Sequence, residues 1–180
     1  MRIETKRLVL RHLKKRDFPD LIENISNLNV SRFMSPIPYP YTEKDAEYYL
    51  EETRKKTDFC FSVELKSEKR VIGGVGLHKQ NYEPAEDIKE LGYWIGEKYW
   101  RKGYCREAVI ALLNIGFKNL KLKKVIIPVF TENKASNVFA KKLGAILAET
   151  RKQDATSKAT GKTHDQNIYE LTMERWKNEI

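Results

Sequence analysis

Apolar and polar residues recur along the chain in patterns that predict a succession of strands and helices. Alternation, as in RLVLRHL at 7–13, indicates a strand with one buried face. Apolar residues three and four positions apart indicate a helix that buries one side. The strands predicted in this way are 7–13, 59–65, 70–79, 88–96, 123–130, 145–151 and 167–173. The helices are predicted after Asp17, from Thr42 to about Lys56, from just after Gly103, and over 134–143.

Polar and proline-rich stretches mark the connections. Asp17 precedes the apolar run of the first helix and is expected to cap it. The residues KSEK between two predicted strands indicate a hairpin. The stretch MSPIPYPY at 34–41 carries three prolines and is expected to be an ordered loop. The polar stretch 152–166 is expected to be a mobile loop and not a domain linker, because only one predicted strand lies beyond it.

The order of these elements predicts a mixed α/β fold in which helices pack on a single layer of sheet. The chain has 180 residues, which is enough for one domain with a sizeable core, and it shows no internal repeat. We therefore expect a single domain over residues 1–180.

Charge and cysteine content narrow the class of protein. The formal net charge of +9 favours anionic partners such as nucleotide cofactors, nucleic acid or ribosomal surfaces, although a solvated Lys-rich surface explains it equally well. Cys60 and Cys105 form no CxxC motif, so neither a zinc site nor a disulfide framework is expected. No apolar run has the form of a signal peptide or a membrane span. These features predict a soluble, cytoplasmic protein without a membrane partner.

The stretch YWRKGYCREAV at 99–109 has the features of a phosphate site. A helix is expected to begin after Gly103, and a helix N-terminus presents unpaired N–H groups and the positive end of the helix dipole. Arg101, Lys102 and Arg106 add positive charge, and Gly103 lets a ligand approach the backbone. A turn decorated with basic surface residues has the same local pattern, so this stretch alone leaves both interpretations open.

Other phosphate motifs fit the chain less well. It contains no GxxxxGK[ST] loop. GGVG at 73–76 resembles part of a dinucleotide fingerprint, but no helix pattern follows it. Glycines in a continuing strand are typical of a place where another group packs closely.

Three blocks of sequence together resemble the GCN5-related N-acetyltransferase (GNAT) superfamily, and within it the branch that acetylates the N-termini of ribosomal proteins. The blocks are ETKRLVLRHLKKRDF near the start, GYWIGEKYWRKGYCREAV at 92–109 and TENKASNVFAKKLGA at 131–145. The superfamily signature Arg/Gln-x-x-Gly-x-Gly/Ala corresponds to residues 100–105, where Trp100 and Cys105 depart from it. Trp at the first of these positions is usual in that branch.

The resemblance implies a mixed, mostly antiparallel sheet of six to seven strands with about four helices. Two central parallel strands are splayed in this fold, and the pantetheine arm of acetyl-CoA lies between them. Gly92 is then a natural bulge position. Pro128 would interrupt a central ladder, but it is tolerated where pairing has already ended, and an ordinary edge strand is the alternative.

The resemblance also implies which residues hold acetyl-CoA, and it implies no metal. Backbone groups of Tyr93, Trp94 and Ile95 would hold the pantetheine. The N–H groups that would hold the pyrophosphate belong to Arg101, Lys102, Gly103, Tyr104, Cys105 and Arg106. Asn133 matches an Asn that bonds near the pantetheine, and capping of the helix is a compatible role for it. Ser136 would face the nucleotide end.

Three positions bear on catalysis. The usual Tyr general acid of the superfamily is replaced by Ala140, and Ile127 and Pro128 stand where another relative has a Glu base. Glu90 is then the candidate base, acting through water, and a surface carboxylate beside Lys89 is the alternative. A thiol at a helix N-terminus invites a nucleophilic role for Cys105, but its position on the apolar face favours a small core residue.

The expected reaction transfers the acetyl group of acetyl-CoA to the N-terminal α-amino group of a ribosomal or other cytoplasmic protein. An α-amine, with a pKa of about 8, is more readily neutral at pH 7 than a Lys amine at about 10.4. The loops 34–41 and 152–166 are the expected walls of the acceptor groove.

Two alternatives stay open. One is the acetylation of a small-molecule amine, such as a polyamine, an amino acid or an antibiotic, and the other is a non-catalytic CoA-binding or ribosome-associated protein. Direct nucleic-acid readout is not expected, because the chain has no RNP motif and no Gly-x-x-Gly loop between helices. The sequence fits a monomer or a homodimer.

Overall fold

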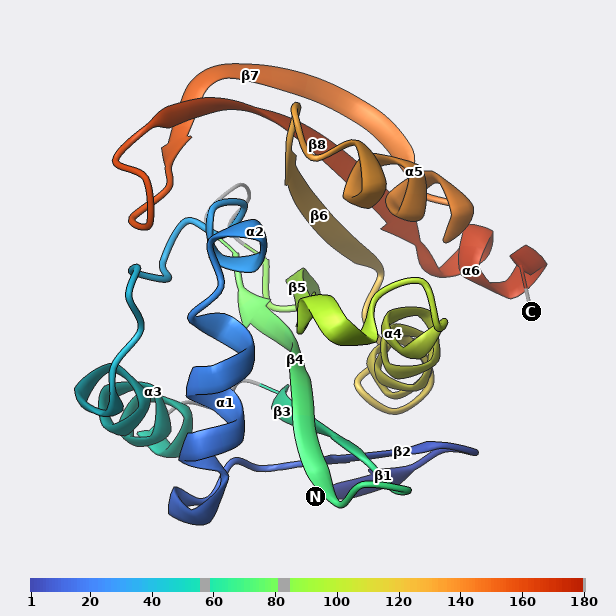
Figure 1. The fold of residues 1–180 in the computed structure, drawn as a ribbon. Helices are drawn as coiled ribbons and strands as arrows, with labels where there is room; N and C mark the ends of the chain where they lie inside the picture. Colours follow the sequence, from blue (N-terminus) through green and yellow to red (C-terminus); the bar gives the residue numbers. More distant parts are fainter. Residues whose placement is uncertain (56–58, 81–84, 180) are drawn as a thin grey trace.

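The computed structural model describes residues 1–55, 59–80 and 85–179. Its strands form one eight-stranded sheet in the spatial order β1-β2-β3-β4-β5-β6-β8-β7 (Figure 1). The strands are β1 (Arg2–Glu4), β2 (Leu8–Arg11), β3 (Phe59–Leu65), β4 (Arg70–Lys79), β5 (Ile88–Ile95), β6 (Lys124–Phe130), β7 (Ile146–Thr156) and β8 (Thr163–Thr172). The helices are α1 (Phe18–Ile25), α2 (Leu28–Ser31), α3 (Glu43–Lys55), α4 (Tyr104–Asn114), α5 (Lys134–Lys142) and α6 (Met173–Glu179).

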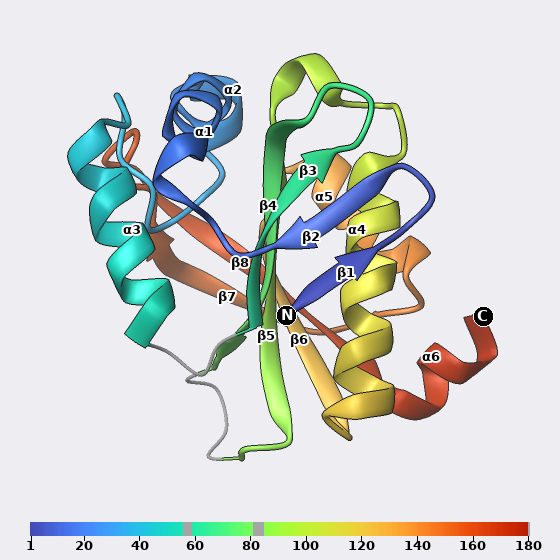
Figure 2. The same cartoon turned by 90° about the horizontal axis from the view of Figure 1, so that it is seen from below.

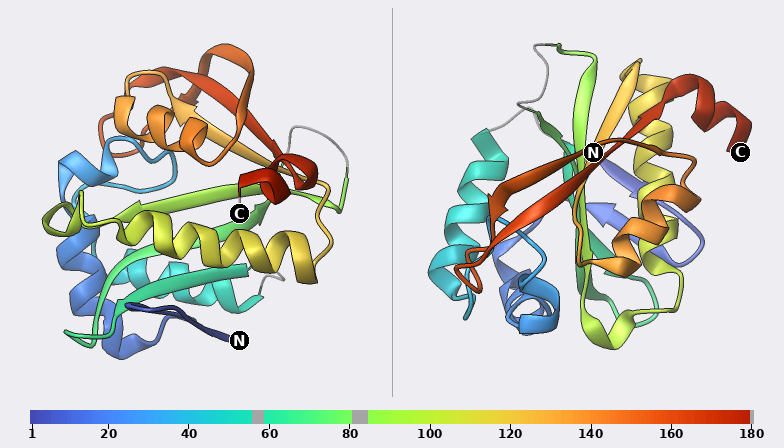
Figure 3. Two further views of the ribbon diagram at one scale, coloured as in Figure 1. Left: turned by 90° about the vertical axis from the view of Figure 1, so that its right-hand side faces the viewer. Right: turned by 90° about the horizontal axis from the view of Figure 1, so that it is seen from above.

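The sheet separates two layers of helices, as Figures 2 and 3 show: α1, α2 and α3 lie on one side, and α4, α5 and α6 on the other. Side chains of β5 alternate between the two layers. Leu91 and Ile95 join the core that also contains Val109 of α4, whereas Trp94 packs against the cluster that contains Phe18 of α1. Each side of the sheet, called here the α1/α3 face and the α4/α5 face, therefore has its own core.

The two central strands β5 and β6 are parallel, and they part soon after they meet. Their pairing comprises Ile88↔Lys124, Lys89↔Val125 and Glu90↔Ile126. Beyond this point β5 stays paired with β4 as far as Ile95, and β6 stays paired with β8 as far as Phe130. The predicted splay of the central parallel strands is confirmed.

Pro128 of β6 and Gly92 of β5 lie at the splay. Pro128 lies inside the sheet, opposite Ile168 of β8 and two residues past the last pair with β5, so the edge-strand alternative is wrong. The bulge predicted at Gly92 is also wrong, because β4 and β5 pair in unbroken register and Gly92 faces Gly76. Two facing glycines leave room above the sheet without any break in the ladder.

Most predicted elements are confirmed, but the sheet and the helices outnumber those that the resemblance implied. The hairpin at KSEK joins β3 and β4 over the predicted residues, and α4 begins directly after Gly103 as expected. The additional elements are the short strand β1 and the helices α2 and α6. The predicted end of the second helix at Lys56 lies outside the described residues. No described helix has the length and apolar character that a membrane span requires.

The stretch 152–166 is not a mobile loop. It forms the end of β7, a turn over 157–162 and the start of β8, which together make a long hairpin (Figure 1). The turn is closed by the bond from the Ser157 N–H to the Lys162 carbonyl at 2.9 Å, and Gly161 takes a positive φ of 69°. β7 is an edge strand with most of its residues exposed, so its composition is polar although it pairs with β8, with register shifts between Leu147 and Glu149 and between Arg151 and Ala155.

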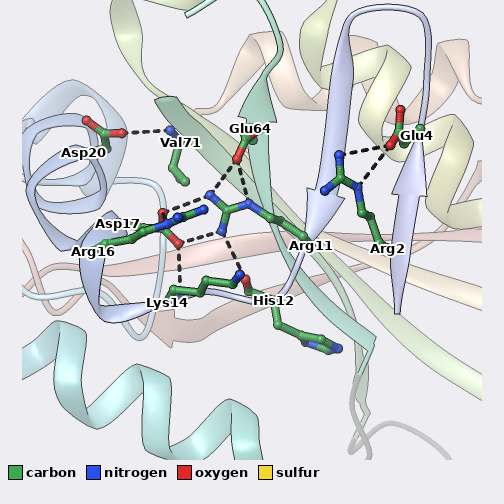
Figure 4. A network of polar contacts seen from close by, with 10 residues as sticks. All are labelled: Arg2, Glu4, Arg11, His12, Lys14, Arg16, Asp17, Asp20, Glu64 and Val71. Carbon is green, nitrogen blue, oxygen red and sulfur yellow. Dashed lines mark hydrogen bonds and ion pairs between the residues drawn. The ribbon is translucent and has the colours of Figure 1, made fainter. Parts of the chain in front are cut away.

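Asp17 does not cap the first helix through its side chain. The carboxylate instead accepts two bonds from the guanidinium of Arg11, at 2.7 and 2.9 Å, and one from the Lys14 N–H at 2.8 Å (Figure 4). Arg11 also bonds Glu64 of β3 at 2.7 Å. Arg11 and Asp17 are both buried, and a buried guanidinium requires carboxylate partners, which explains why the Asp17 side chain turns away from the helix.

Candidate active site

The parting of the central strands leaves one edge of β5 without a strand partner from Leu91 to Ile95 within the described residues. Tyr93 reaches from this segment to α5, where its hydroxyl lies 2.7 Å from Oγ of Ser136. Its ring packs edge-on against Phe139, with centroids 5.1 Å apart. The structure therefore brings Tyr93 and Ser136 together on the α4/α5 face of the opening.

The N-terminus of α4 follows the end of β5 through a tight connection. Arg101 and Gly103 both have positive φ values, of 60° and 79°. The first backbone bond of the helix runs from the Glu107 N–H to the Gly103 carbonyl, so the N–H groups of residues 104–106 precede the hydrogen-bonded ladder. Left-handed residues ahead of a helix form a concave set of N–H groups that suits an anion. The predicted helix start is confirmed, and the basic residues of the connection lie around it.

A carboxylate fixes this helix end to the N-terminal strands. Glu107 accepts bonds from the Thr5 hydroxyl at 2.6 Å, from the Arg7 N–H at 2.8 Å and from Arg7 Nε at 2.7 Å. The same guanidinium bonds the carbonyl of Lys102 at 2.9 Å and lies over the ring of Tyr104, 4.5 Å from its centroid. Arg7 and Glu107 thus hold the connection in place. Sequence reasoning did not single them out, because no local pattern links positions so far apart.

The start of α5 lies on the β6 side of the opening. The side chain of Asn133 accepts a bond from the Ser136 N–H at 3.2 Å and caps the helix, which confirms the compatible capping role. Asn137, which the sequence reasoning did not name, donates to the carbonyls of Phe130 and Asn133 and accepts from the Tyr169 hydroxyl at 3.0 Å. These bonds fix the angle at which α5 leaves β6.

Cys105 is a packing residue. Its side chain packs against the core of the α4/α5 face, and burial raises the pKa of its thiol to about 12. A thiol that stays protonated at neutral pH is a poor nucleophile. The core interpretation of this side chain therefore holds, and its surroundings disfavour a nucleophilic role.

Glu90 is the last residue of β5 that pairs with β6. Its side chain is largely buried, and this burial raises the pKa of its carboxyl to about 7. Alternation along β5 places it on the α1/α3 face with Trp94. An exposed surface carboxylate beside Lys89 would keep a pKa close to that of a model acid, so the surface alternative does not describe this side chain.

The two stretches expected to wall an acceptor groove meet at their tips. The Lys158 N–H in the β7–β8 turn donates to the carbonyl of Ser35 in the loop between α2 and α3, at 3.2 Å. Met34 and Ile37 of that loop pack against the cluster that also contacts Trp94. The loop therefore packs on the α1/α3 face, and its tip contacts the hairpin turn. Across residues 1–55, 59–80 and 85–179, no group of His, Cys, Asp and Glu side chains is arranged to hold a metal ion.

Comparison with known proteins assigns the fold to one class of enzyme. Residues 7–146 match the family model described as an acetyltransferase (GNAT) domain. The uncharacterised N-acetyltransferase YnaD of Bacillus subtilis is 30% identical over 98% of this chain and 99% of its own length. A GNAT-family acetyltransferase from Bacillus anthracis superposes with a TM-score of 0.83 at 26% identity, covering 97% of this chain and 99% of that one. The ribosomal-protein-S5-alanine acetyltransferase of Vibrio fischeri has the same fold, with a TM-score of 0.79 at 18% identity over 98% of both chains.

A splayed parallel pair beside a helix N-terminus defines an acyltransferase fold of the kind that these relatives share. The chain belongs to the GNAT acetyltransferase family, and it is an N-acetyltransferase. Enzymes of this family take the acetyl group from acetyl-CoA.

Proposed function

We propose that this enzyme transfers the acetyl group of acetyl-CoA to the N-terminal α-amino group of a ribosomal or other cytoplasmic protein. One observation carries the proposal: β5 parts from β6 beside the N-terminus of α4, and a largely buried carboxylate lies where they part. An extended acyl chain and an amine can meet at such an opening from opposite faces of the sheet.

The residues around the opening fit acetyl-CoA, which supplies the reactive thioester. Tyr93, Trp94 and Ile95 lie on the part of β5 that β6 has left, where an extended amide chain could bond along the edge as an added strand does. The carbonyl of Ile95 already accepts a bond from the Trp100 indole at 2.6 Å. The N–H groups at the start of α4 suit the pyrophosphate, and the nearby Arg101, Lys102 and Arg106 supply positive charge. Asn133 and Ser136 border the opening from α5.

Glu90 is the proposed proton acceptor. An amine must be neutral to attack a carbonyl carbon, and a base with a pKa near the working pH removes its proton most efficiently. Burial brings the carboxyl of Glu90 into that range. The N–H groups from Tyr93 to Ile95 would polarise the thioester carbonyl, and proximity supplies most of the remaining acceleration.

Three features favour a protein N-terminus as the acceptor. An α-amine loses its proton more easily than a Lys side chain, which suits a site that lacks the usual Tyr acid. The net charge of +9 disfavours polycationic polyamines. The comparison with the ribosomal-protein-S5-alanine acetyltransferase concerns the fold, and it motivates the choice of ribosomal proteins as first candidates.

A direct competition tests the acceptor. Peptides that begin with Ala or Ser are compared with spermidine, with free amino acids and with an internal-Lys peptide whose N-terminus is blocked. We expect the Ala- and Ser-starting peptides to have the highest kcat/KM. A higher value for spermidine or for the blocked Lys peptide would overturn the acceptor assignment, and no transfer to any amine would overturn the proposed reaction.

A further inference from the structure

Two buried polar atoms at the tip of the β7–β8 hairpin have no hydrogen-bond partner among the described residues. They are Oγ of Ser157 and Nε2 of His164. Ser157 is 0% exposed, and the side chain of His164 is 13% exposed. A polar atom that is buried without a partner lowers the stability of a fold, and most proteins avoid it. Two such atoms in one hairpin therefore indicate a role outside the folding of the chain.

Ser157 and His164 are neighbours on one face of the hairpin. His164 is the register partner of Ala155, and Ser157 follows Ala155 by two residues. Alternation along the strands therefore turns both side chains to the same side, as diagonal neighbours whose Cβ atoms are about 7–8 Å apart. The hydroxyls of Thr156 and Thr163, which lie 2.9 Å from each other, belong to the opposite side. One short segment of another chain could contact Ser157 and His164 together.

The imidazole of His164 is held in a fixed orientation. Its ring stacks on Phe130, with centroids 4.5 Å apart and an interplanar angle of 20°. Nδ1 lies 3.0 Å from a carboxylate oxygen of Glu132. Because an ionised carboxylate only accepts hydrogen bonds, Nδ1 carries a proton and donates it to this bond. Nε2 is then left for a further partner, from which it accepts a bond when the ring is neutral and to which it donates when the ring is charged.

His164 lies on the same face of the sheet as Glu90. Ile126 of β6 pairs with Glu90 and belongs to the cluster on their common face, whereas Val129 belongs to the core of the α4/α5 face. Phe130 follows Ile126 by four residues, so its ring and that of His164 lie on the α1/α3 face. Four residues of a strand span about 13 Å. An extended chain whose amine lies near Glu90 would bring its fourth residue to the level of these rings.

The contact between the hairpin turn and the loop 34–41 lies next to Ser157. The Lys158 N–H donates to the Ser35 carbonyl at 3.2 Å. This bond joins two connections of the chain, and such contacts open at a lower cost in free energy than the strands of a core. A chain that passes between the turn and the loop would therefore reach Ser157 and His164.

We propose that Ser157 and His164 bind the main chain of the acceptor near its fourth residue, and that the acceptor is an extended peptide of at least this length. The inference rests on the proposed function. The hydroxyl of Ser157 can donate to a carbonyl, and Nε2 of His164 can bond to an amide, so the pair suits a peptide main chain. A polyamine has N–H groups but no carbonyl, and a free amino acid is too short to extend from Glu90 to the hairpin.

The length dependence of the reaction tests the inference. Uncharged, amidated peptides of two and of five residues, both beginning with Ser-Ala, are compared as acceptors. In the wild type, kcat/KM should be about tenfold higher for the pentapeptide, which is the effect of one or two hydrogen bonds. Ser157→Ala and His164→Phe should each reduce this ratio severalfold, and Phe keeps a ring that can stack on Phe130. Thr156→Val changes the opposite side of the hairpin and is the matched control, which should keep the ratio of the wild type.

Thermal unfolding and calorimetry give readouts that a structural role would move differently. Ser157→Ala removes an unpaired buried hydroxyl, so the Tm of the free enzyme should stay equal or rise, while the Kd of the pentapeptide in the presence of CoA should rise severalfold. A lower Tm with an unchanged length ratio would overturn the inference, because the hydroxyl would then serve the fold through an ordered water.

Equal kcat/KM for the two peptides in the wild type would also overturn the inference and would leave the proposed function intact. Absence of transfer to both peptides would overturn the proposed function, and the inference with it.

Discussion

Glu90 of β5 and Glu107 of α4 both belong to elements that border the opening, and their surroundings set opposite charge states. Burial disfavours the charged form of both carboxyls. At Glu107 the hydrogen bonds from Thr5 and Arg7 outweigh this effect and hold the pKa below its usual range. At Glu90 burial is the cause that sets the pKa of the carboxyl, and it raises this pKa to about 7. One carboxyl therefore serves as a permanent anchor, and the other can exchange a proton at neutral pH.

The rate effect of Glu90→Gln follows from this difference. Removal of the proton acceptor should lower kcat by about 10²- to 10⁴-fold and leave the Kd of acetyl-CoA unchanged. Steady-state kinetics and calorimetry measure the two quantities. Glu86→Gln, an exposed carboxylate just before β5, is the control and should change neither. A similar loss of rate in the control would indicate a general effect of charge.

The same substitution should change stability in a pH-dependent way. The folded-state pKa of Glu90 is raised from 4.5 to about 7, so the stabilisation by its neutral form is complete below pH 4.5 and is lost as the pH rises through 7. At pH 8 the wild type carries a buried charge that Gln lacks. Glu90→Gln should therefore be more stable by about 2 kcal/mol at pH 8, with solvent screening allowed for, and nearly equal at pH 4. Urea unfolding at the two pH values checks this, and a greater advantage at pH 4 would contradict it.

Gly103 and Gly161 provide a matched pair for the proposed pyrophosphate site. Both have positive φ, at 79° and 69°, so Val should strain the backbone at either place by about 1–2 kcal/mol. Gly161 lies in the β7–β8 turn and Gly103 at the start of α4. Gly103→Val should weaken acetyl-CoA binding by about tenfold or more, which is the effect expected when one anion contact is lost. Gly161→Val should leave the binding of acetyl-CoA unchanged. Calorimetry on both variants decides, and equal affinities would exclude the start of α4 as the pyrophosphate site.

At the scale of elements, the paired carboxylates around Arg11 join β2 to β3 and to the turn before α1. Burial opposes the charge of Asp17, but the Arg11 guanidinium holds the pKa of that carboxyl below its usual range. Stability from this pairing is thus present above pH 3.8 and is lost as the pH falls through the folded-state pKa. The network holds the first helix layer against the sheet, far from the splay.

Asp17→Asn should leave the buried Arg11 with Glu64 as its remaining carboxylate partner. We expect a loss of about 3 kcal/mol at pH 7 and a smaller loss at a pH below the folded-state pKa, where the wild type also loses the charge. Chemical denaturation at both pH values measures the difference. Glu4→Gln, which removes an exposed partner of Arg2, should have little effect at either pH. An equal loss at the two pH values would show that the carboxylate charge is not the cause.

Elements with a clear buried face could be predicted from the sequence almost to the residue, as β3, β4 and α4 show. The second half of β7 and the start of β8 could not, because an edge strand that is exposed on most of its length has no apolar alternation. The side chain of Asp17 was misassigned for a different reason: its partner Arg11 lies on a strand, and a local capping rule does not consider it. Local periodicity thus predicts elements, whereas tertiary partners decide what polar side chains do.

At the scale of the whole molecule, the site combines parts that are distant in the chain. Glu107 and Arg7 are a hundred residues apart, and the opening is bordered by β5, β6, α4 and α5. The resemblance of three sequence blocks to the GNAT superfamily could predict that these parts form one site. The spacing of residues along the chain could not predict it. The placement of Ser157 beside His164 likewise depends on the register of β7 and β8.

Positive charge on the enzyme should strengthen the binding of acetyl-CoA more than the binding of a donor without phosphates. Arg101, Lys102 and Arg106 flank the start of α4, where the phosphates are proposed to bind, so the KM of acetyl-CoA should rise severalfold as salt increases from about 0.05 to 0.5 M. Acetyl-pantetheine, which lacks the nucleotide, is the control donor and should show little change. An equal salt effect on both donors would place the electrostatic attraction elsewhere on the surface.

The order β6-β8-β7 places the strand that is synthesised last between two that are made before it. While the chain is still leaving the ribosome, residues 146–156 have no strand with which to pair, and the outer edge of β6 is equally uncovered. Both are completed only when residues 163–172 arrive. The β6 wall of the opening is therefore finished only after residues 163–172 have been made, and a nascent chain that stalls earlier carries an open strand edge that invites pairing with other chains.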